Sequence, residues 1–232
     1  MSVSPPGRIA IAQEPEPEGA ARPEPDNVTV KAAHGIEEMT QALVVRAAVF
    51  LGEHDCPYAE EFDGNDCTAT HFIGYVGDEP ASACRVRYFA DFARLERVAV
   101  RREFRGQAVG AKMIEFAHEF CRRKGYRKLH GQAEEHLVRF WEKFGWRRID
   151  APSFAYGGHR YLEIECDLEP HEEPITTDGD PMLFIRPEGA WQKPCLLERS
   201  TIRPVTEKAD EGSEGDEWAA ELKNRIKRLG SI

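Results

Sequence analysis

The chain of 232 residues carries a formal net charge of -10, with 41% hydrophobic and 31% charged residues. This acidic balance argues against a general nucleic-acid binder, and no run approaches the ~20 apolar residues that span a bilayer. The sequence shows no basic-then-apolar signal segment, so we expect a cytoplasmic protein without nucleic-acid or membrane partners. Six scattered cysteines without a CxxC pair predict reduced, structural thiols.

The first 27 residues are expected to form a disordered leader. They hold six of the fifteen prolines and the acidic repeat Glu14 to Glu18. Proline removes backbone donors and like charges repel each other, so this segment cannot build a core. The folded domain is expected to begin at a short strand from Val28 to Val30.

The first half of the domain predicts one helix followed by antiparallel strands. Apolar residues recur at helical spacing from Ile36 to Leu51, and the helix should end near Gly52. Two strands, His71–Val76 and Ala83–Phe89, flank a turn sequence and therefore predict a hairpin. A third strand is expected from Leu95 to Val100.

The second half alternates helices and strands. A helix should run to about Lys124, with Gly125 as its cap, and a strand is expected over Lys128–Ala133. A second helix is predicted from Glu134 to Phe144, where Gly145 stops it. Two closing strands, Trp146–Ile149 and Tyr161–Leu168, complete a mixed α+β sheet in a domain covering residues 28–168.

The segment 169–232 is expected to form a C-terminal extension with a terminal amphipathic helix. Asp216 is a suitable cap for that helix. Four apolar residues share one of its faces: Trp218, Leu222, Ile226 and Leu229. Something must cover this face, either the domain's own surface or a partner such as the second subunit of a homodimer.

The stretch from Arg105 to Gly110 predicts an anion site. It leads from a strand through small residues into a helix, which gathers unpaired backbone N–H groups at the positive end of the helix dipole. The surrounding segment from Arg101 to Lys128 carries nine Lys/Arg against three Asp/Glu, so an acidic protein presents a local basic surface here. A phosphate-bearing ligand is the natural occupant.

With these elements placed, residues 28–168 resemble the GNAT N-acetyltransferase superfamily. The pyrophosphate signature of that superfamily, Arg/Gln-x-x-Gly-x-Gly/Ala, is matched by Arg105, Ala108 and Gly110, with Ala108 in place of the usual Gly. Ala is tolerated there if the residue is already helical, so we expect weaker or slightly shifted cofactor binding. The segment from Phe140 to Trp146 resembles the Phe-Tyr-x-x-x-Gly-Phe block that closes the core.

A third block resembles the ElaA/YjcF-like branch. The branch pattern Glu-Gln-x-Cys-Pro-Tyr, followed by spaced aspartates and a His, is similar to Glu53–Tyr58 with Asp63, Asp66 and His71. His54 replaces the Gln of that pattern.

The resemblance implies an acetyl-CoA-dependent N-acetyltransferase. Pantetheine would bond to the backbone of the Leu95–Val100 strand, and the pyrophosphate would bind the turn that follows. The residues implied in cofactor binding are Val98, Ala99, Val100, Arg105, Gly106, Gln107, Ala108, Val109, Gly110, Ala111 and Trp141. No metal is expected.

The transfer reaction needs a neutral amine and a proton for the departing thiolate. Glu96 is the candidate general base, because it lies on the strand that would carry the thioester; the alternative is a salt-bridge partner beside Arg97. Trp141 stands at the place of the usual Tyr acid and cannot titrate usefully. Tyr58 or Tyr156 could take over that role, or line a pocket.

Carboxylates in the loop after the first helix would attract a cationic acceptor. Glu53, Tyr58 and Asp63 are the candidate substrate-binding residues, and the alternative is a solvated acidic loop. The same loop holds residue types that suit zinc, namely His54, Cys56, Cys67 and His71, but it lacks the tight paired spacing of structural zinc sites.

Two functions of different classes follow. The first is acetyl transfer to a primary amine, with a small molecule favoured over a protein, by direct attack in a ternary complex. The alternative is a catalytically silent acyl-CoA-binding protein that keeps the fold for regulation or interaction. The change from Tyr to Trp at position 141 and Ala108 favour the second, whereas Glu96 and the Arg105 turn favour the first.

Overall fold

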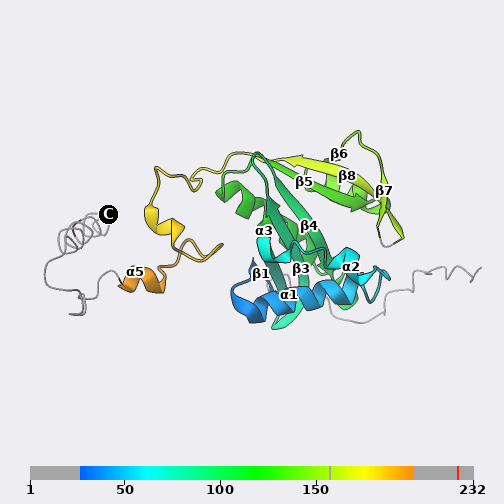
Figure 1. Ribbon diagram of the computed structural model, residues 1–232, viewed down its shortest axis with the longest axis horizontal. Helices are drawn as coiled ribbons and strands as arrows, with labels where there is room; N and C mark the ends of the chain where they lie inside the picture. Colours follow the sequence, from blue (N-terminus) through cyan, green and yellow to red (C-terminus); the bar gives the residue numbers. More distant parts are fainter. Residues whose placement is uncertain (1–26, 157, 201–223, 225–232) are drawn as a thin grey trace, which may run out of the picture.

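A computed structural model describes residues 27–156, 158–200 and 224. In this part of the chain the strands form one sheet of eight, in the order β1-β2-β3-β4-β5-β8-β6, with β7 pairing β8 at the side (Figure 1). The first four strands, β1 (Val28–Ala32), β2 (Thr70–Val76), β3 (Glu79–Tyr88) and β4 (Ala93–Val100), are antiparallel. The α+β fold predicted from the sequence is thus confirmed.

Two long helices cover opposite faces of the first half of the sheet. Helix α1 (Gly35–Phe50) packs Ala42, Val45 and Val49 against Ile73 and Ala99. Helix α3 (Val109–Arg123) places its apolar stripe against the other face, where neighbouring strand residues point. That core contains Phe72, Leu95, Met113, Ile114 and Ala117. Because strand side chains alternate between faces, Phe72 and Ile73 enter different cores.

The second half of the sheet consists of β5 (Lys128–Glu134), β6 (Trp146–Arg148), β7 (Phe154–Tyr156) and β8 (His159–Asp167). Strand β5 is parallel to β4, but only Ala93–Leu95 pairs with Leu129–Gly131. Beyond this point β4 stays with β3 as far as Val100, while β5 stays with β8 as far as Glu134. The two central strands therefore part and form a fork, which opens toward the start of α3.

The fork begins at a glycine. A Cβ at Gly131 would lie 3.2 Å from the carbonyl oxygen of Leu95 and 3.1 Å from the Trp146 ring. Shortly after Leu95, β4 is irregular. Its register with β3 shifts between Ala83 and Arg85, and Arg97 has a φ of 55°. The local bulge bends β4 away from β5.

Most predicted elements are confirmed, but the helix predicted from Glu134 to Phe144 begins later and is shorter. Residue Glu134 does not begin a helix but ends β5, because it pairs with Tyr161 of β8. A 3₁₀ turn, η4 (Glu135–Leu137), follows, and the helix α4 covers only Val138–Glu142. The short strand β7 was not predicted, since three residues carry too little periodicity to be recognised.

The remaining elements are short. Between α1 and β2 lie α2 (Tyr58–Glu61) and the 3₁₀ turn η2 (Asp66–Thr68), and η3 (Arg102–Phe104) joins β4 to α3. Within the described residues, no helix combines the length and the apolar character needed to cross a membrane.

The described part of the C-terminal extension packs on α3. Trp191 is buried with its ring 4.8 Å from that of Phe120, and the Ile175 N–H donates to the carbonyl of Arg123 at 2.8 Å. The extension also contains the 3₁₀ helix η5 (Pro181–Phe184) and the short α-helix α5 (Leu196–Ser200). The terminal helix predicted around Asp216 to Leu229 and the predicted leader lie outside the described residues.

Candidate active site

The turn between β4 and α3 has the geometry of an anion cradle. Gly106 and Ala108 both have positive φ, at 81° and 58°, so the chain turns sharply before α3 begins at Val109. The first helical bond runs from the Lys112 N–H to the Ala108 carbonyl at 2.9 Å. The N–H groups of Val109, Gly110 and Ala111 accordingly lie in the first turn, ahead of any intrahelical acceptor.

Two further residues shape this cradle. The Arg105 Nε donates to the carbonyl of Val100 at 3.1 Å, which holds the guanidinium at the end of β4. Gly110 faces the same strand, and a Cβ there would lie 3.3 Å from Val100 Cγ2. A larger residue at position 110 would therefore crowd the strand along which the sequence predicts pantetheine to run.

Ala108 does not adopt the helical conformation that was assumed for it. It is the N-cap of α3, with φ 58° and ψ -8°, in the left-handed region. There the Cβ of an L-residue crowds its own backbone, at a cost of roughly 1–2 kcal/mol that glycine avoids. The usual Gly of the signature is thus explained by backbone conformation, and the departure at Ala108 costs stability.

Replacing Ala108 by glycine should stabilise the protein by about 0.5–1 kcal/mol, because relief of the left-handed strain exceeds the extra entropy of an unfolded glycine. Urea denaturation of the two proteins measures this difference. The matched control is Gly106→Ala, which places a Cβ at φ 81° in open space and should destabilise by about 1 kcal/mol. A destabilised Ala108→Gly protein would contradict the strain argument.

Glu53 lies at this cradle. Its carboxylate accepts from Arg105 Nη2 at 2.6 Å and lies 3.6 Å from Arg102 Nε. Glu53 is predicted from the sequence to bind the acceptor, but its partners are the arginines of the turn between β4 and α3. A bound pyrophosphate would compete with Glu53 for the Arg105 guanidinium.

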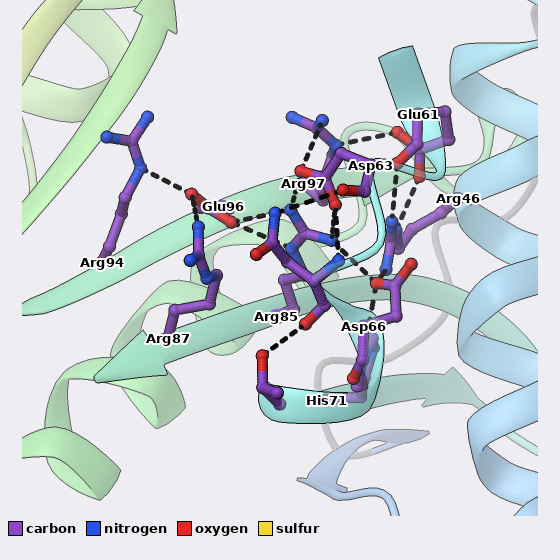
Figure 2. A network of polar contacts seen from close by, with 12 residues as sticks. Arg46, Glu61, Asp63, Asp66, His71, Arg85, Arg87, Arg94, Glu96 and Arg97 are labelled. Atoms are coloured by element: carbon purple, nitrogen blue, oxygen red, sulfur yellow. Dashed lines mark hydrogen bonds and ion pairs between the residues drawn. The ribbon is translucent and has the colours of Figure 1, made fainter. Parts of the chain in front are cut away.

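Glu96, the predicted base, is enclosed by arginines (Figure 2). It accepts from Arg85 Nε at 2.9 Å, forms an ion pair with Arg94 at 2.5 Å, and lies 3.7 Å from Arg87. Taking a proton from an amine would require it to give up one of these charge-assisted hydrogen bonds. The geometry fits Glu96 as a salt-bridge residue better than as a general base, although its partners are Arg85 and Arg94 rather than Arg97.

The predicted substrate residue Asp63 belongs to the same network. Arg85 is fully buried and binds both Asp63, at 2.5 and 2.9 Å, and Asp66, at 2.8 Å. The equally buried Arg46 binds Glu61 and Asp66, at 2.7 and 2.6 Å. Figure 2 shows these arginines reaching from α1 and β3 toward the loop of residues 61–66. The network fastens this loop to the sheet.

Ionisation of Asp63 is coupled to its contact with Arg85. Partial burial alone would raise its pKa, but the hydrogen bonds from Arg85 and Asn65 outweigh burial and hold the pKa of Asp63 well below its usual value. The carboxylate is therefore charged over the whole physiological range.

The other predicted site residues are separated. Tyr58 is 69% exposed, and its ring lies tilted against that of Phe62, with the centroids 4.9 Å apart. Trp141 is buried beside Trp146, at 5.3 Å, in the core under α3. The side chains of Val98 and Ala99 point into opposite cores of the sheet. A ligand along this strand would therefore bind its backbone groups, not these side chains.

The residues weighed as zinc ligands also have separate partners. His71 Nε2 lies 3.0 Å from the carbonyl of Asp66, and the Cys56 thiol donates to the carbonyl of Pro57 at 3.6 Å. Cys67 is exposed, and His54 turns toward β5.

A second polar cluster, which was not predicted from the sequence, surrounds Glu134 at the end of β5. Its buried carboxylate lies 3.5 Å from His54 Nδ1, 3.4 Å from His136 Nδ1 and 3.1 Å from His159 Nδ1. Tyr161 adds its hydroxyl at 3.3 Å. These residues come from the loop after α1, from η4 and from β8. The assumption that Glu134 began a helix hid this arrangement.

Sequence comparison decides the family. Residues 38–146 match the model of the acetyltransferase (GNAT) family. The chain is 30% identical over 116 residues to protein ElaA of Escherichia coli (strain K12), covering 47% of this chain and 75% of ElaA. The chain belongs to the GNAT acetyltransferase family. It is also 28% identical over 131 residues to the uncharacterized N-acetyltransferase YjcF of Bacillus subtilis (strain 168), covering 56% of this chain and 94% of YjcF.

Solved GNAT structures share the fold. The crystal structure of Escherichia coli ElaA matches 60% of this chain and 97% of its own, with a TM-score of 0.53 and 23% identity. An acyl-CoA N-acyltransferase from Pseudomonas aeruginosa matches 60% of this chain and 98% of its own, with a TM-score of 0.53 and 20% identity. The resemblance to the ElaA/YjcF-like branch is confirmed, and the GNAT chain is an N-acetyltransferase.

The family model leaves part of the GNAT domain outside its match. It ends at Trp146, so β7 and β8, which carry His159 and Tyr161, lie beyond it. Residues of the Glu134 cluster therefore come from matched and unmatched segments.

Proposed function

We propose that the protein transfers the acetyl group of acetyl-CoA to a primary amine of a small molecule, by direct attack within a ternary complex. The observation that carries this proposal is the fork between β4 and β5, which leads to the cradle at the start of α3. Three N–H groups and Arg105 suit a pyrophosphate, and the freed edge of β4 suits an extended pantetheine arm. Acetyl-CoA would supply the activated thioester.

The face of the fork on the α1 side suits a cationic acceptor. Side chains of β5 and β8 that point to this face are polar, and Glu163 holds His130 and Gln132 at 3.0 and 2.8 Å. With Glu134 nearby, this half-buried surface carries two carboxylates whose partners are imidazoles, an amide and a hydroxyl. An ammonium group entering here would gain charge-assisted hydrogen bonds.

A bridge over this side favours a compact acceptor. The Tyr156 hydroxyl donates to the carbonyl of Glu60 at 2.7 Å, and the Arg97 guanidinium lies 4.7 Å from the Tyr156 ring centre. These contacts join the α2 loop to the β7–β8 hairpin, which lie next to each other in Figure 1. A protein segment would have to break the bridge to pass, whereas a small amine would not.

Binding and turnover should be measured separately. Titration calorimetry with acetyl-CoA and CoA tests the cradle, and release of free CoA across a panel of polyamines, aminoglycosides, amino acids and peptide amines tests the reaction. We expect both cofactor forms to bind and at least one small amine to release CoA. Absence of binding would contradict the cofactor assignment. Binding without turnover on any amine would favour a silent acyl-CoA-binding protein, and turnover on peptide amines alone would contradict the small-molecule acceptor.

A further inference from the structure

The inference concerns the proton acceptor and rests on the proposed function. Glu96 is paired with arginines, which favours a different group as the acceptor of the ammonium proton. The described residues bring a carboxylate and several imidazoles together at the end of β5, around Glu134. If the register of β4 and β5 continued past Leu95 and Gly131, Glu134 would lie level with Val98. The cluster thus lies level with the bulge in β4.

Within the cluster, the imidazole of His54 lies beside the carboxylate of Glu134. Its Nδ1 is shielded from solvent and lies 3.5 Å from Glu134 Oε1, an electrostatic contact longer than an ordinary hydrogen bond. A carboxylate in this position favours the proton on Nδ1, which leaves the lone pair on Nε2. The side chain is 24% exposed, and because Nδ1 is buried, the exposed part lies on other atoms of the side chain.

The ring of His54 is held on both sides. It stacks on His159 at 5.0 Å and meets the edge of Phe50 at 5.8 Å. Its neighbour in sequence, Glu53, binds Arg105 of the phosphate cradle. One short loop therefore connects the cradle to Glu134, and His54 is the residue of that loop which faces the fork.

Charged groups of both signs face His54. These groups are Glu53 of its own loop, Arg105 of the turn before α3, Glu134 of β5 and His159 of β8. The imidazole of His136 is at the rim of the cluster, 71% exposed. Burial lowers the pKa of His54 below its ordinary value, and the carboxylate of Glu134 opposes that effect only in part. The ring is consequently neutral, and able to accept a proton, at neutral pH.

We propose that His54 is the general base of the acetyl transfer and that Glu134 is the residue that positions it. A proton moves from the ammonium group of the acceptor to Nε2 of His54, and the resulting free amine attacks the carbonyl carbon of the thioester. The C–N bond forms, the C–S bond breaks with its electron pair on sulfur, and the second amine proton passes to the thiolate. Protonated His54 then returns its proton to solvent.

This assignment gives a specific meaning to the departure at position 54. The related pattern carries Gln there, which cannot accept a proton in this range. Replacing His54 by Gln keeps the size and polarity of the side chain while removing the base. It is therefore the sharpest test variant.

We expect His54→Gln to reduce kcat/KM for the best amine of the panel by about 10²-fold or more, the typical contribution of a general base. Wild-type kcat/KM should fall as pH decreases through the pKa of His54, below about 6.5, because only the neutral ring accepts a proton. His54→Gln should lack this acidic limb. Glu134→Gln should shift the limb to lower pH, because the carboxylate that raises the pKa is gone.

The control is His171→Gln, which removes an imidazole that pairs with Glu119 of α3, outside the Glu134 cluster, and should leave kcat/KM within about twofold. Affinity for CoA, measured by calorimetry, should be similar in all four proteins, so loss of turnover is not loss of cofactor. A His54→Gln protein with near wild-type kcat/KM and an unchanged acidic limb would overturn the inference while the proposed function stands. A wild type that turns over no amine would overturn both.

Discussion

Replacing Arg85 by leucine is expected to lower the free energy of unfolding by about 3–5 kcal/mol, the usual cost of removing one partner from a buried ion pair. Arg85 is fully buried and holds three carboxylates, those of Asp63, Asp66 and Glu96. Without the guanidinium, these charges remain in a poorly hydrated site. Urea denaturation followed by circular dichroism measures the change.

The control for this prediction is Arg87→Leu on the same strand. Arg87 lies 3.7 Å from Glu96 with a partly exposed side chain, so its loss should cost less than about 1 kcal/mol. Arg85→Lys should fall between the two, because lysine keeps the charge but cannot bind several carboxylates as a planar fork. Equal stabilities of the Arg85→Leu and Arg87→Leu proteins would show that the network does not fasten the loop.

Acid should reduce the difference between wild type and Arg85→Leu. The pKa of Asp63 is lower in the folded protein than its ordinary value near 3.9. The contribution of Asp63 to the free energy of unfolding is therefore complete above about pH 4 and is lost as pH falls through the lower folded pKa. The variant lacks this contribution at any pH, so the two unfolding curves should approach each other in acid.

Replacing Arg105 by alanine should weaken CoA binding by about 10- to 100-fold, because one charged hydrogen-bond donor to phosphate contributes about 1.5–3 kcal/mol. The loss also frees the Glu53 carboxylate, which would then repel the pyrophosphate. Titration calorimetry with CoA measures the change. The double variant Arg105→Ala/Glu53→Gln should bind better than Arg105→Ala alone, by removing that repulsion.

Arg102→Ala is the control for this second prediction. Arg102 belongs to the same turn and carries the same charge. Its side chain is 73% exposed, however, and its nearest approach to Glu53 is 3.6 Å, longer than a hydrogen bond. Its removal tests the general field of the basic segment and should change affinity by less than about threefold. If both arginine variants lose affinity equally, the cradle acts through its field and not through Arg105 itself.

Local sequence predicted the fold well because its signals come from neighbouring residues. Helical spacing in α1 and α3, the hairpin of β2 and β3, and the strand-to-helix turn at Arg105 all depend on contacts within a few positions. Where a signal depended on a distant partner, prediction was wrong. Glu134 is a strand residue only because Tyr161 pairs with it, and no nearby residue indicates that pairing.

The same division applies to the candidate site. The sequence by itself determined the family and predicted the turn from Arg105 to Gly110, because backbone turns and unpaired N–H groups are local properties of the chain. Only the tertiary structure decided which ionisable groups meet: Asp63 and Glu96 reach Arg85, Glu53 reaches Arg105, and His54 reaches Glu134 and His159. Charge–charge and hydrogen-bond contacts act over a few ångströms in space, and a linear spacing of residues carries no record of those distances.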